Sequence, residues 1–254
     1  MPSRQVNSLA VAAAFALFAM FLFCARDEHG TWRNDYSCLT TSRGSPATTG
    51  SQPPTPDPKE LKDHATGLTL PRKKRFSKGD LVCLGVGVRA KSIAVVKVNV
   101  YTVGLYVDPK GARGPLKKFA GSDPAELRQD VSLFKALGQA GFTKYLHLVF
   151  ARSVGAQQVV DALTSVKGVS EEALSRFSSI MLEAVGKNVG KGETVSLGWE
   201  GKDKLVILVR DKPAGTVVDA ALPKAIFDLY LGSSPVSREA KAAFAEGVPA
   251  LLSS

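Results

Sequence analysis

Alternation between apolar and polar residues predicts strands from about residue 80 onward. Glycines punctuate the first apolar run, and β-branched side chains dominate the second. A later pair of alternating runs flanks Gly201, which is the pattern of a β-hairpin. The strands expected from this pattern are residues 80–88, 92–107, 142–151, 194–199, 204–209 and 216–220.

Capping signals mark where helices should begin. Asp123 is followed by Pro and then, two residues later, by Glu, an arrangement that favours a helix start. Ser170 precedes two glutamates and a helical stripe of apolar residues. The helices expected from these signals and from 3.6-residue periodicity are residues 123–137, 154–163, 170–185, 222–231 and 237–251.

The order of these elements predicts the fold class. Strands occur in runs and do not alternate strictly with helices. That order favours an α+β fold with a mainly antiparallel sheet over a doubly wound parallel sheet. We expect one folded domain over residues 67–252.

The first residues have a different pattern. Residues 9–25 form an uncharged apolar run with Arg4 before it and charged residues after it. A helix of that length rises about 25 Å, enough to span a thin bilayer. Residues 1–28 are therefore predicted to be a signal-anchor, with membrane contact through residues 9–25, and a cleaved signal peptide fits almost as well.

Residues 29–66 are rich in Ser, Thr, Pro and Gly. Such a composition cannot bury enough apolar surface to offset the entropy of ordering, so we expect a disordered linker. The leader predicts a membrane-anchored or secretory protein. An acid-poor, Ser/Thr-rich stretch after a signal-like helix also suits a bipartite plastid-targeting leader, which is the alternative localisation.

Composition and charge narrow the function classes. Apolar residues make up 44% of the chain, enough for an ordinary core, and the net charge is +10. The basic excess is spread out except for the run at residues 72–75. That run could contact nucleic acid or anionic lipid, but we interpret it as a solvated linker. No basic stripe studded with aromatic residues follows it, so nucleic-acid binding is not expected.

The cysteines and histidines do not form a pattern that would hold a metal. The three cysteines lack the close spacing of a zinc site or a disulfide framework, and the three histidines are scattered. Cys83 is expected as a buried hydrophobe and His147 as a structural histidine. No metal site is predicted.

Gly85-Val86-Gly87-Val88-Arg89-Ala90 matches the G-x-G-x-x-A pattern of dinucleotide sites. That pattern works only where a helix opens at its third position and meets the pyrophosphate. Strand-forming residues follow here instead. We therefore interpret the match as coincidental and expect no cofactor.

Arg89 ends one apolar strand, and Tyr101 lies on the next strand if the chain turns back near Lys91. A buried guanidinium needs a partner, because an unpaired buried charge is costly. Its planar fork suits a carboxylate or a phenolate-like oxygen, and a tyrosine hydroxyl could serve the same anion. The pattern alone favours an internal ion pair with Asp or Glu; a bound ligand is the alternative.

Residues 85–108, GVGVRAKSIAVVKVNVYTVGLYVD, resemble the signature of the chalcone isomerase superfamily. Residues 227–237, FDLYLGSSPVS, are similar to its helix–glycine–turn–helix ending. The resemblance covers about residues 67–252. It implies an open-faced β-sandwich, in which a layer of helices covers a large antiparallel sheet and the ligand cleft lies between them.

The resemblance also bears on catalysis. True isomerases of this family use the arginine with a threonine, a tyrosine and an asparagine. Arg89 matches the arginine, but the threonine position falls on Tyr101, the tyrosine position near Gln158 and the asparagine position near Ser165. The late threonine or serine position falls near Leu229. The arginine is thus kept, and the other polar groups are replaced.

An arginine and a tyrosine without those groups resemble the fatty-acid-binding branch of the superfamily. This implies a non-catalytic domain in which Arg89 and Tyr101 hold the carboxylate of a fatty acid and apolar walls hold its tail. The alternative is a chalcone–flavanone isomerase, an intramolecular lyase in which Arg89 steers a phenoxide. A third possibility is a structural role with Arg89 paired internally.

Overall fold

The computed structural model describes residues 59–93 and 95–253. These belong to a compact unit over Gln52–Ser254, and the predicted leader at 1–28, the apolar run at 9–25 and most of the predicted linker lie outside the described residues. Within the described residues, none of the helices has the length and apolarity to cross a bilayer.

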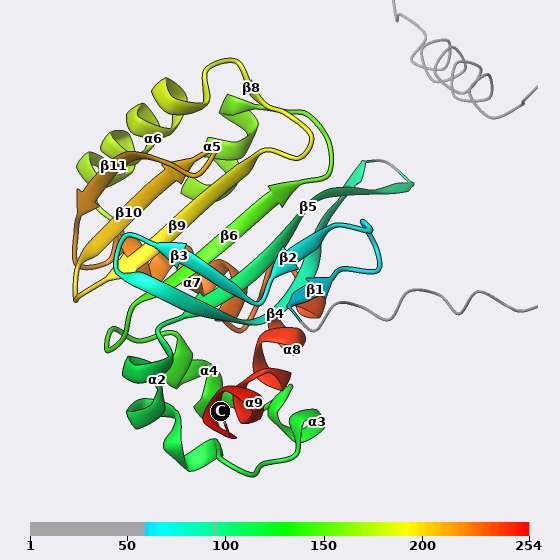
Figure 1. Ribbon diagram of the computed structural model, residues 1–254. Coiled ribbons are helices and arrows are strands. Elements are labelled where there is room, and N and C mark those ends of the chain that lie inside the picture. The colour runs from blue at the N-terminus through cyan, green and yellow to red at the C-terminus, as the bar shows by residue number, and fades with distance from the viewer. Residues whose placement is uncertain (1–58, 94, 254) are drawn as a thin grey trace, which may run out of the picture. The chain divides into compact units, whose positions relative to one another are not determined.

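A seven-stranded antiparallel sheet forms the centre of the unit (Figure 1). Its spatial order is β11-β10-β9-β6-β5-β4-β3. Its strands are β3 (Lys73–Phe76), β4 (Gly79–Ile93), β5 (Val96–Val107), β6 (Lys144–Phe150), β9 (Thr194–Glu200), β10 (Lys204–Val209) and β11 (Lys212–Val218). The α+β class with an antiparallel sheet is therefore confirmed.

Two small sheets flank this one. Strand β1 (Glu60–Lys62) pairs with β2 (Thr69–Pro71), and β7 (Val154–Gly155) pairs with β8 (Asn188–Val189). Strand β1 lies ahead of residue 67, where the sequence placed the start of the domain, so ordered structure extends into the end of the predicted linker.

Helices cover one face of the sheet. Figure 1 shows α5 and α6 at one end and α2, α4, α8 and α9 gathered at the other, with α7 between them. The helices are α2 (Pro109–Leu116), α3 (Pro124–Leu127), α4 (Val131–Leu137), α5 (Ala156–Thr164), α6 (Glu171–Val185), α7 (Leu222–Leu231), α8 (Arg238–Glu246) and α9 (Val248–Ser253), with a 3-10 turn at Lys117–Phe119.

Two predicted helices are each broken into two, which corrects the sequence analysis. The helix expected over 123–137 stops at Leu127 and restarts at Val131, because the Asp130 side chain accepts hydrogen bonds from the backbone N–H groups of Ser132 and Leu133. The helix expected over 237–251 is divided at Gly247, between α8 and α9.

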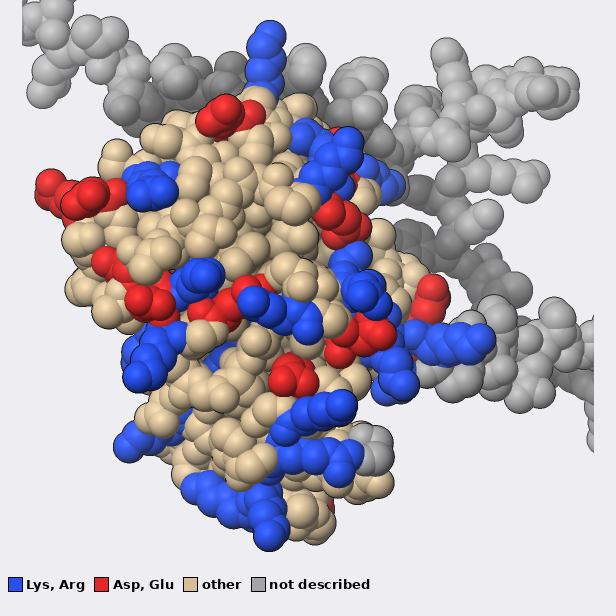
Figure 2. Space-filling view, turned by 60° about the vertical axis from the view of Figure 1, so that its left-hand side comes forward, with Lys and Arg blue, Asp and Glu red and all other residues tan. Residues whose placement is uncertain are grey.

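The basic run at residues 72–75 is not a linker, contrary to our interpretation. It leads into β3, the edge strand of the large sheet, where Lys74 forms an ion pair with Asp211. Charged side chains on an edge strand discourage pairing with other chains. Figure 2 shows Lys and Arg interspersed with Asp and Glu over much of one face, as expected for a dispersed basic excess.

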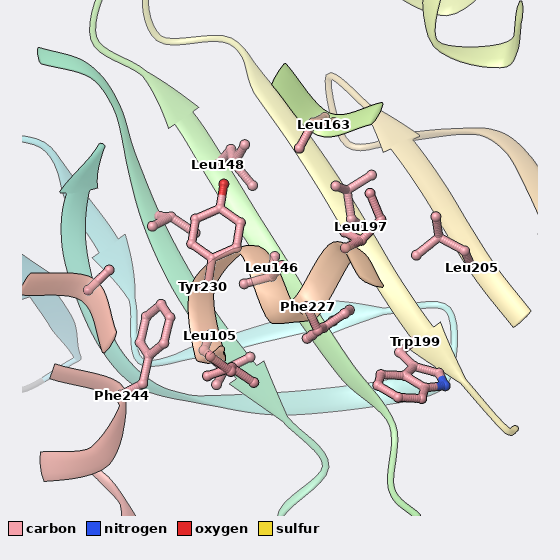
Figure 3. Close-up of a cluster of buried hydrophobic side chains, with 14 of the residues drawn as sticks. Leu105, Leu146, Leu148, Leu163, Leu197, Trp199, Leu205, Phe227, Tyr230 and Phe244 are labelled. Atoms are coloured by element: carbon pink, nitrogen blue, oxygen red, sulfur yellow. The ribbon is translucent and has the colours of Figure 1, made fainter. Parts of the chain in front are cut away.

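The core lies between the sheet and the helices. In β5 the alternate residues Val103, Leu105 and Val107 face the helices, whereas Tyr106 joins a smaller cluster on the opposite face. Figure 3 shows Phe227 and Tyr230 of α7 packed over the leucines of the central strands. The helix-covered face thus supplies the apolar environment in which a ligand cavity can form.

Close packing of α8 on β4 explains the two glycines of the G-x-G motif. A Cβ atom at Gly85 would lie 2.2 Å from the Ala243 carbonyl oxygen, and one at Gly87 would lie 2.5 Å from the Ala240 Cα. Strand β4 continues through this motif to Ile93, and no helix opens there. The motif therefore serves helix–sheet packing, and its position beside α8 sets the place of Arg89.

Candidate ligand-binding site

The β4–β5 hairpin places Arg89 directly opposite Tyr101 in antiparallel register. The hairpin turns after Ile93, a few residues beyond the turn expected near Lys91. Directly opposed residues project from the same face of a sheet, which here is the helix-covered face. The structure therefore brings together the two site residues that the sequence singled out.

Backbone carbonyl groups hold the Arg89 guanidinium in place. Its Nη1 donates to the carbonyl oxygen of Ala90 at 2.7 Å and to that of Val236 at 2.9 Å. Next to this contact, the Ser237 hydroxyl caps α8 and donates to the Val88 carbonyl at 2.7 Å. The loop between α7 and α8 thereby fixes the arginine against the sheet.

The internal ion pair that the pattern favoured for Arg89 is not found. None of the ion pairs among the described residues includes Arg89. The guanidinium also forms a hydrogen bond with the Tyr101 side chain, which partly offsets the rise that burial causes in the pKa of Tyr101. A half-buried guanidinium without a carboxylate partner can accept an anion.

The Tyr101 hydroxyl shares a hydrogen bond of 2.7 Å with the hydroxyl of Tyr230, from α7. Burial raises the pKa of Tyr101 and that of Tyr230, the latter strongly, so both phenols stay protonated. The charge of Arg89 acts in the opposite direction on both pKa values, which places the guanidinium near the two hydroxyls. Sequence reasoning missed Tyr230, although the residue lies within the 227–237 stretch.

A cavity of about 250 Å³ opens beside Arg89 and Tyr101. Its inner walls are apolar, and Figure 3 shows the Tyr230 hydroxyl pointing toward Leu148, one of the lining residues. Apart from Ala162, the exposed residues of its lining are polar or charged, and they mark its mouth. The lining consists of Arg89, Lys91, Val98, Val100, Tyr101, Leu148, Phe150, Arg152, Ser153, Val154, Gln158, Val159, Ala162 and Leu163.

The positions that the resemblance assigned to catalytic groups are dispersed. Gln158 lies in the lining of the cavity with Arg89, but Ser165 and Leu229 line a separate open groove of about 1260 Å³ between α4, α7 and α8. The cavity lining therefore combines the half-buried Arg89, the Tyr101 phenol and two exposed cations, Lys91 and Arg152, with apolar inner walls. That combination suits a carboxylate with an apolar tail.

Other polar groups that the sequence raised lie elsewhere. His147 is buried on the opposite face of the sheet, where it shares a hydrogen bond of 2.7 Å with Ser196 and burial lowers its pKa to about 4. Cys83 is buried on that face too, and burial raises its pKa to about 12. The structural roles expected for both residues are confirmed. The described residues contain no cluster of metal-ligating side chains.

Comparison with known proteins points to one family. A family model described as chalcone isomerase-like matches residues 62–244. Fatty-acid-binding protein 1 of Arabidopsis thaliana is 26% identical over 180 residues, which cover 66% of this chain and 64% of that protein. The chain thus matches less than two thirds of that relative's length.

A solved structure shares the fold. The crystal structure of the Arabidopsis thaliana fatty-acid binding protein AtFAP1 superposes with a TM-score of 0.66 at 23% sequence identity. The superposition covers 77% of this chain and all of the other. The open-faced arrangement of sheet and helices expected from the sequence is thereby confirmed.

Proposed function

Because this chain belongs to the chalcone isomerase-like family, we propose that its folded domain binds a fatty acid or a similar carboxylate without catalysing a reaction on it. One observation carries the proposal. Arg89 lines a cavity with apolar inner walls and has no ion-pair partner among the described residues. A ligand carboxylate would supply the missing ion-pair partner of Arg89.

The donors around the cavity suit a carboxylate head. The Nε and Nη2 groups of Arg89 can donate to its two oxygens in the planar arrangement that guanidinium groups favour. If Tyr230 donates to the Tyr101 oxygen, the Tyr101 proton is left for the ligand. Because both phenols remain protonated, neither adds a negative charge that would repel the carboxylate.

The inner walls suit an acyl tail. Leu148, Phe150 and Val159 are buried residues of the lining, and Leu163 on α5 extends the apolar surface. Each methylene transferred from water to such a surface contributes about 0.8 kcal/mol. The cavity volume of about 250 Å³ is just below the range of about 300–1,000 Å³ that is usual for ligand pockets, which suits a single acyl chain.

The relatives support binding over catalysis. The Arabidopsis relative and the solved Arabidopsis structure that this chain resembles carry the same description, fatty-acid-binding protein. The isomerase alternative rests on the retained Arg89, whereas Ser165 and Leu229 lie outside the cavity and are not the expected catalytic types. A single arginine can stabilise an anion, but it lacks the groups that would order the substrate and a water molecule.

Laurate titration of the full chain tests the proposal. We expect Arg89→Leu to weaken laurate binding about 100-fold, because charge-assisted hydrogen bonds contribute about 1.5–3 kcal/mol each. Arg176→Leu, on the exposed surface of α6 and outside the cavity, is the matched control and should bind as the parent does. Unchanged affinity in Arg89→Leu would refute the proposed site.

Incubation with naringenin chalcone distinguishes the alternative. We expect cyclisation at the spontaneous rate. A faster rate that Arg89→Leu abolishes would instead identify the domain as an isomerase.

A further inference from the structure

The turn of the β4–β5 hairpin exposes two adjacent apolar side chains. Val95 is 99% exposed and Val96 is 58% exposed, and Figure 1 shows the hairpin extending beyond the neighbouring strands. Single exposed valines are common on protein surfaces. Two in succession at a projecting turn present apolar surface to whatever the hairpin meets.

Cationic side chains lie on the hairpin and beside its base. Lys91 and Lys97 lie on the two strands of the hairpin, and Arg152 follows the end of β6; all three are exposed. Lys97 is 4.0 Å from Glu239 on α8, but both side chains are well exposed, so this ion pair is weak. None of the ion pairs in residues 59–93 and 95–253 includes Lys91 or Arg152.

Two of these cations, Lys91 and Arg152, border the mouth of the ligand cavity. Lys91 is paired with Val98 across the hairpin, and both line the cavity together with Arg152. The lining becomes buried further in, at Leu148 and Phe150. The hairpin that carries the two valines therefore also forms part of the entrance to the cavity.

We propose that this turn docks the domain on an anionic lipid bilayer, with Val95 and Val96 among the headgroups and Lys91, Lys97 and Arg152 against lipid phosphates. Apolar side chains flanked by cations are the composition of interfacial membrane anchors. Transfer of an acyl chain out of water is favourable both into a bilayer and into an apolar cavity. Docking at the mouth of the cavity would let a fatty acid pass between the bilayer and the cavity. The identity of this ligand rests on the proposed function.

Hydrogen–deuterium exchange on the full chain locates the docking surface. The probes are vesicles of phosphatidylcholine alone and vesicles of equal parts phosphatidylcholine and phosphatidylglycerol. We expect only the anionic vesicles to slow exchange at residues 95–99, and high salt to reverse the effect. The double variant Val95→Asp/Val96→Asp should lose this protection.

Matched controls are available in the same fold. Val131, on α4, is 80% exposed and Val218, on β11, is 63% exposed, and neither lies in the cavity lining. Val131→Asp and Val218→Asp should keep the vesicle-dependent protection. Protection confined to residues 1–58, or retained in the double variant, would overturn the proposal. Absence of protection with both vesicle types would refute it and favour a protein partner at the turn.

Transfer kinetics separate docking from ligand binding. We expect the double variant to take laurate from anionic vesicles roughly tenfold more slowly, since two valines no longer insert. Its affinity for laurate without vesicles should stay unchanged. A parent chain that is protected by vesicles but binds no laurate would refute the proposed function and support the docking surface.

Discussion

Two cations on the helix-covered face of the sheet have different surroundings. Arg89 borders the cavity, whereas Lys144 on β6 is fully buried and donates to the carbonyl oxygens of Leu137, at 2.8 Å, and Gln139. The Lys144 ammonium also lies over the rings of Phe142 and Trp199. Lys144 therefore closes the C-terminal end of α4, while Arg89 lines the cavity that we propose as the ligand site.

Lys144 gives a prediction for stability against pH. Burial lowers its pKa to about 7, below the ordinary value of 10.5, so the unfolded chain binds more protons between these values. The free energy of unfolding should therefore rise with pH above 7, by up to about 1.4 kcal/mol per pH unit from this group. Lys144→Met should remove the rise in urea unfolding measured from pH 7 to 9.

The exposed Lys204 provides the control for that measurement, and Lys204→Met should keep the rise. Above about pH 9 the buried Cys83 has the opposite effect, because its pKa is raised to about 12 and the unfolded thiol ionises first. An identical pH profile in Lys144→Met and the parent would show that Lys144 is not the group responsible.

At the same scale, the sequence predicted one half of the site. Arg89 and Tyr101 follow from strand alternation and a tight turn, because both lie in one hairpin. Tyr230 and the Val236 carbonyl come from more than a hundred residues further on, and only tertiary packing brings them to the hairpin. Lys144 gave no signal at all within an ordinary apolar strand.

Among the elements, the β4–α8 contact connects packing to the site. Helix α8 begins at Ser237, next to the Val236 carbonyl that holds Arg89, and lies against Gly85 and Gly87 of β4. A side chain on either glycine would separate helix and strand. The position of the arginine therefore depends on two residues that themselves carry no functional group.

We expect Gly87→Ala to lower the free energy of unfolding by about 1–3 kcal/mol, because the added Cβ would overlap the Ala240 backbone. Laurate affinity should fall as well, since α8 carries the loop that orients Arg89. Gly114→Ala, within α2 where nothing lies within 4 Å of the added atom, should be neutral or stabilising. Urea unfolding of both variants and of the parent checks this prediction. If Gly87→Ala were as stable as the parent, the packing argument would be contradicted.

Sequence reasoning found the long elements and missed the short ones for a physical reason. Strands β5, β6, β9 and β10 and helices α6 and α7 show strong periodicity over several residues. Helix α2 contains two glycines and an internal Pro115, so its propensity is poor, and the Asp108 cap and the core hold it. Strands β1 to β3 are three or four residues long and form through pairing alone.

On the scale of the whole molecule, ligand binding and folding are linked. A ligand that binds only the folded domain stabilises it by about 2.7 kcal/mol at a concentration 100 times its Kd. For a domain of this size, that raises the melting temperature by roughly 5–10 °C. The cavity lies between the sheet and α5, so ligand contacts would join strands to helices that otherwise meet only through the core.

Differential scanning calorimetry of the parent chain should show that rise in melting temperature with laurate. 1-Dodecanol has an equally long tail and no charge, and it should produce a much smaller rise. The difference between the two ligands reports the contribution of the carboxylate. In Arg89→Leu that difference should vanish while the small response to 1-dodecanol persists, because the apolar walls are unchanged. An equal rise with both ligands in the parent would mean that the tail alone drives binding and that Arg89 is not the anchor.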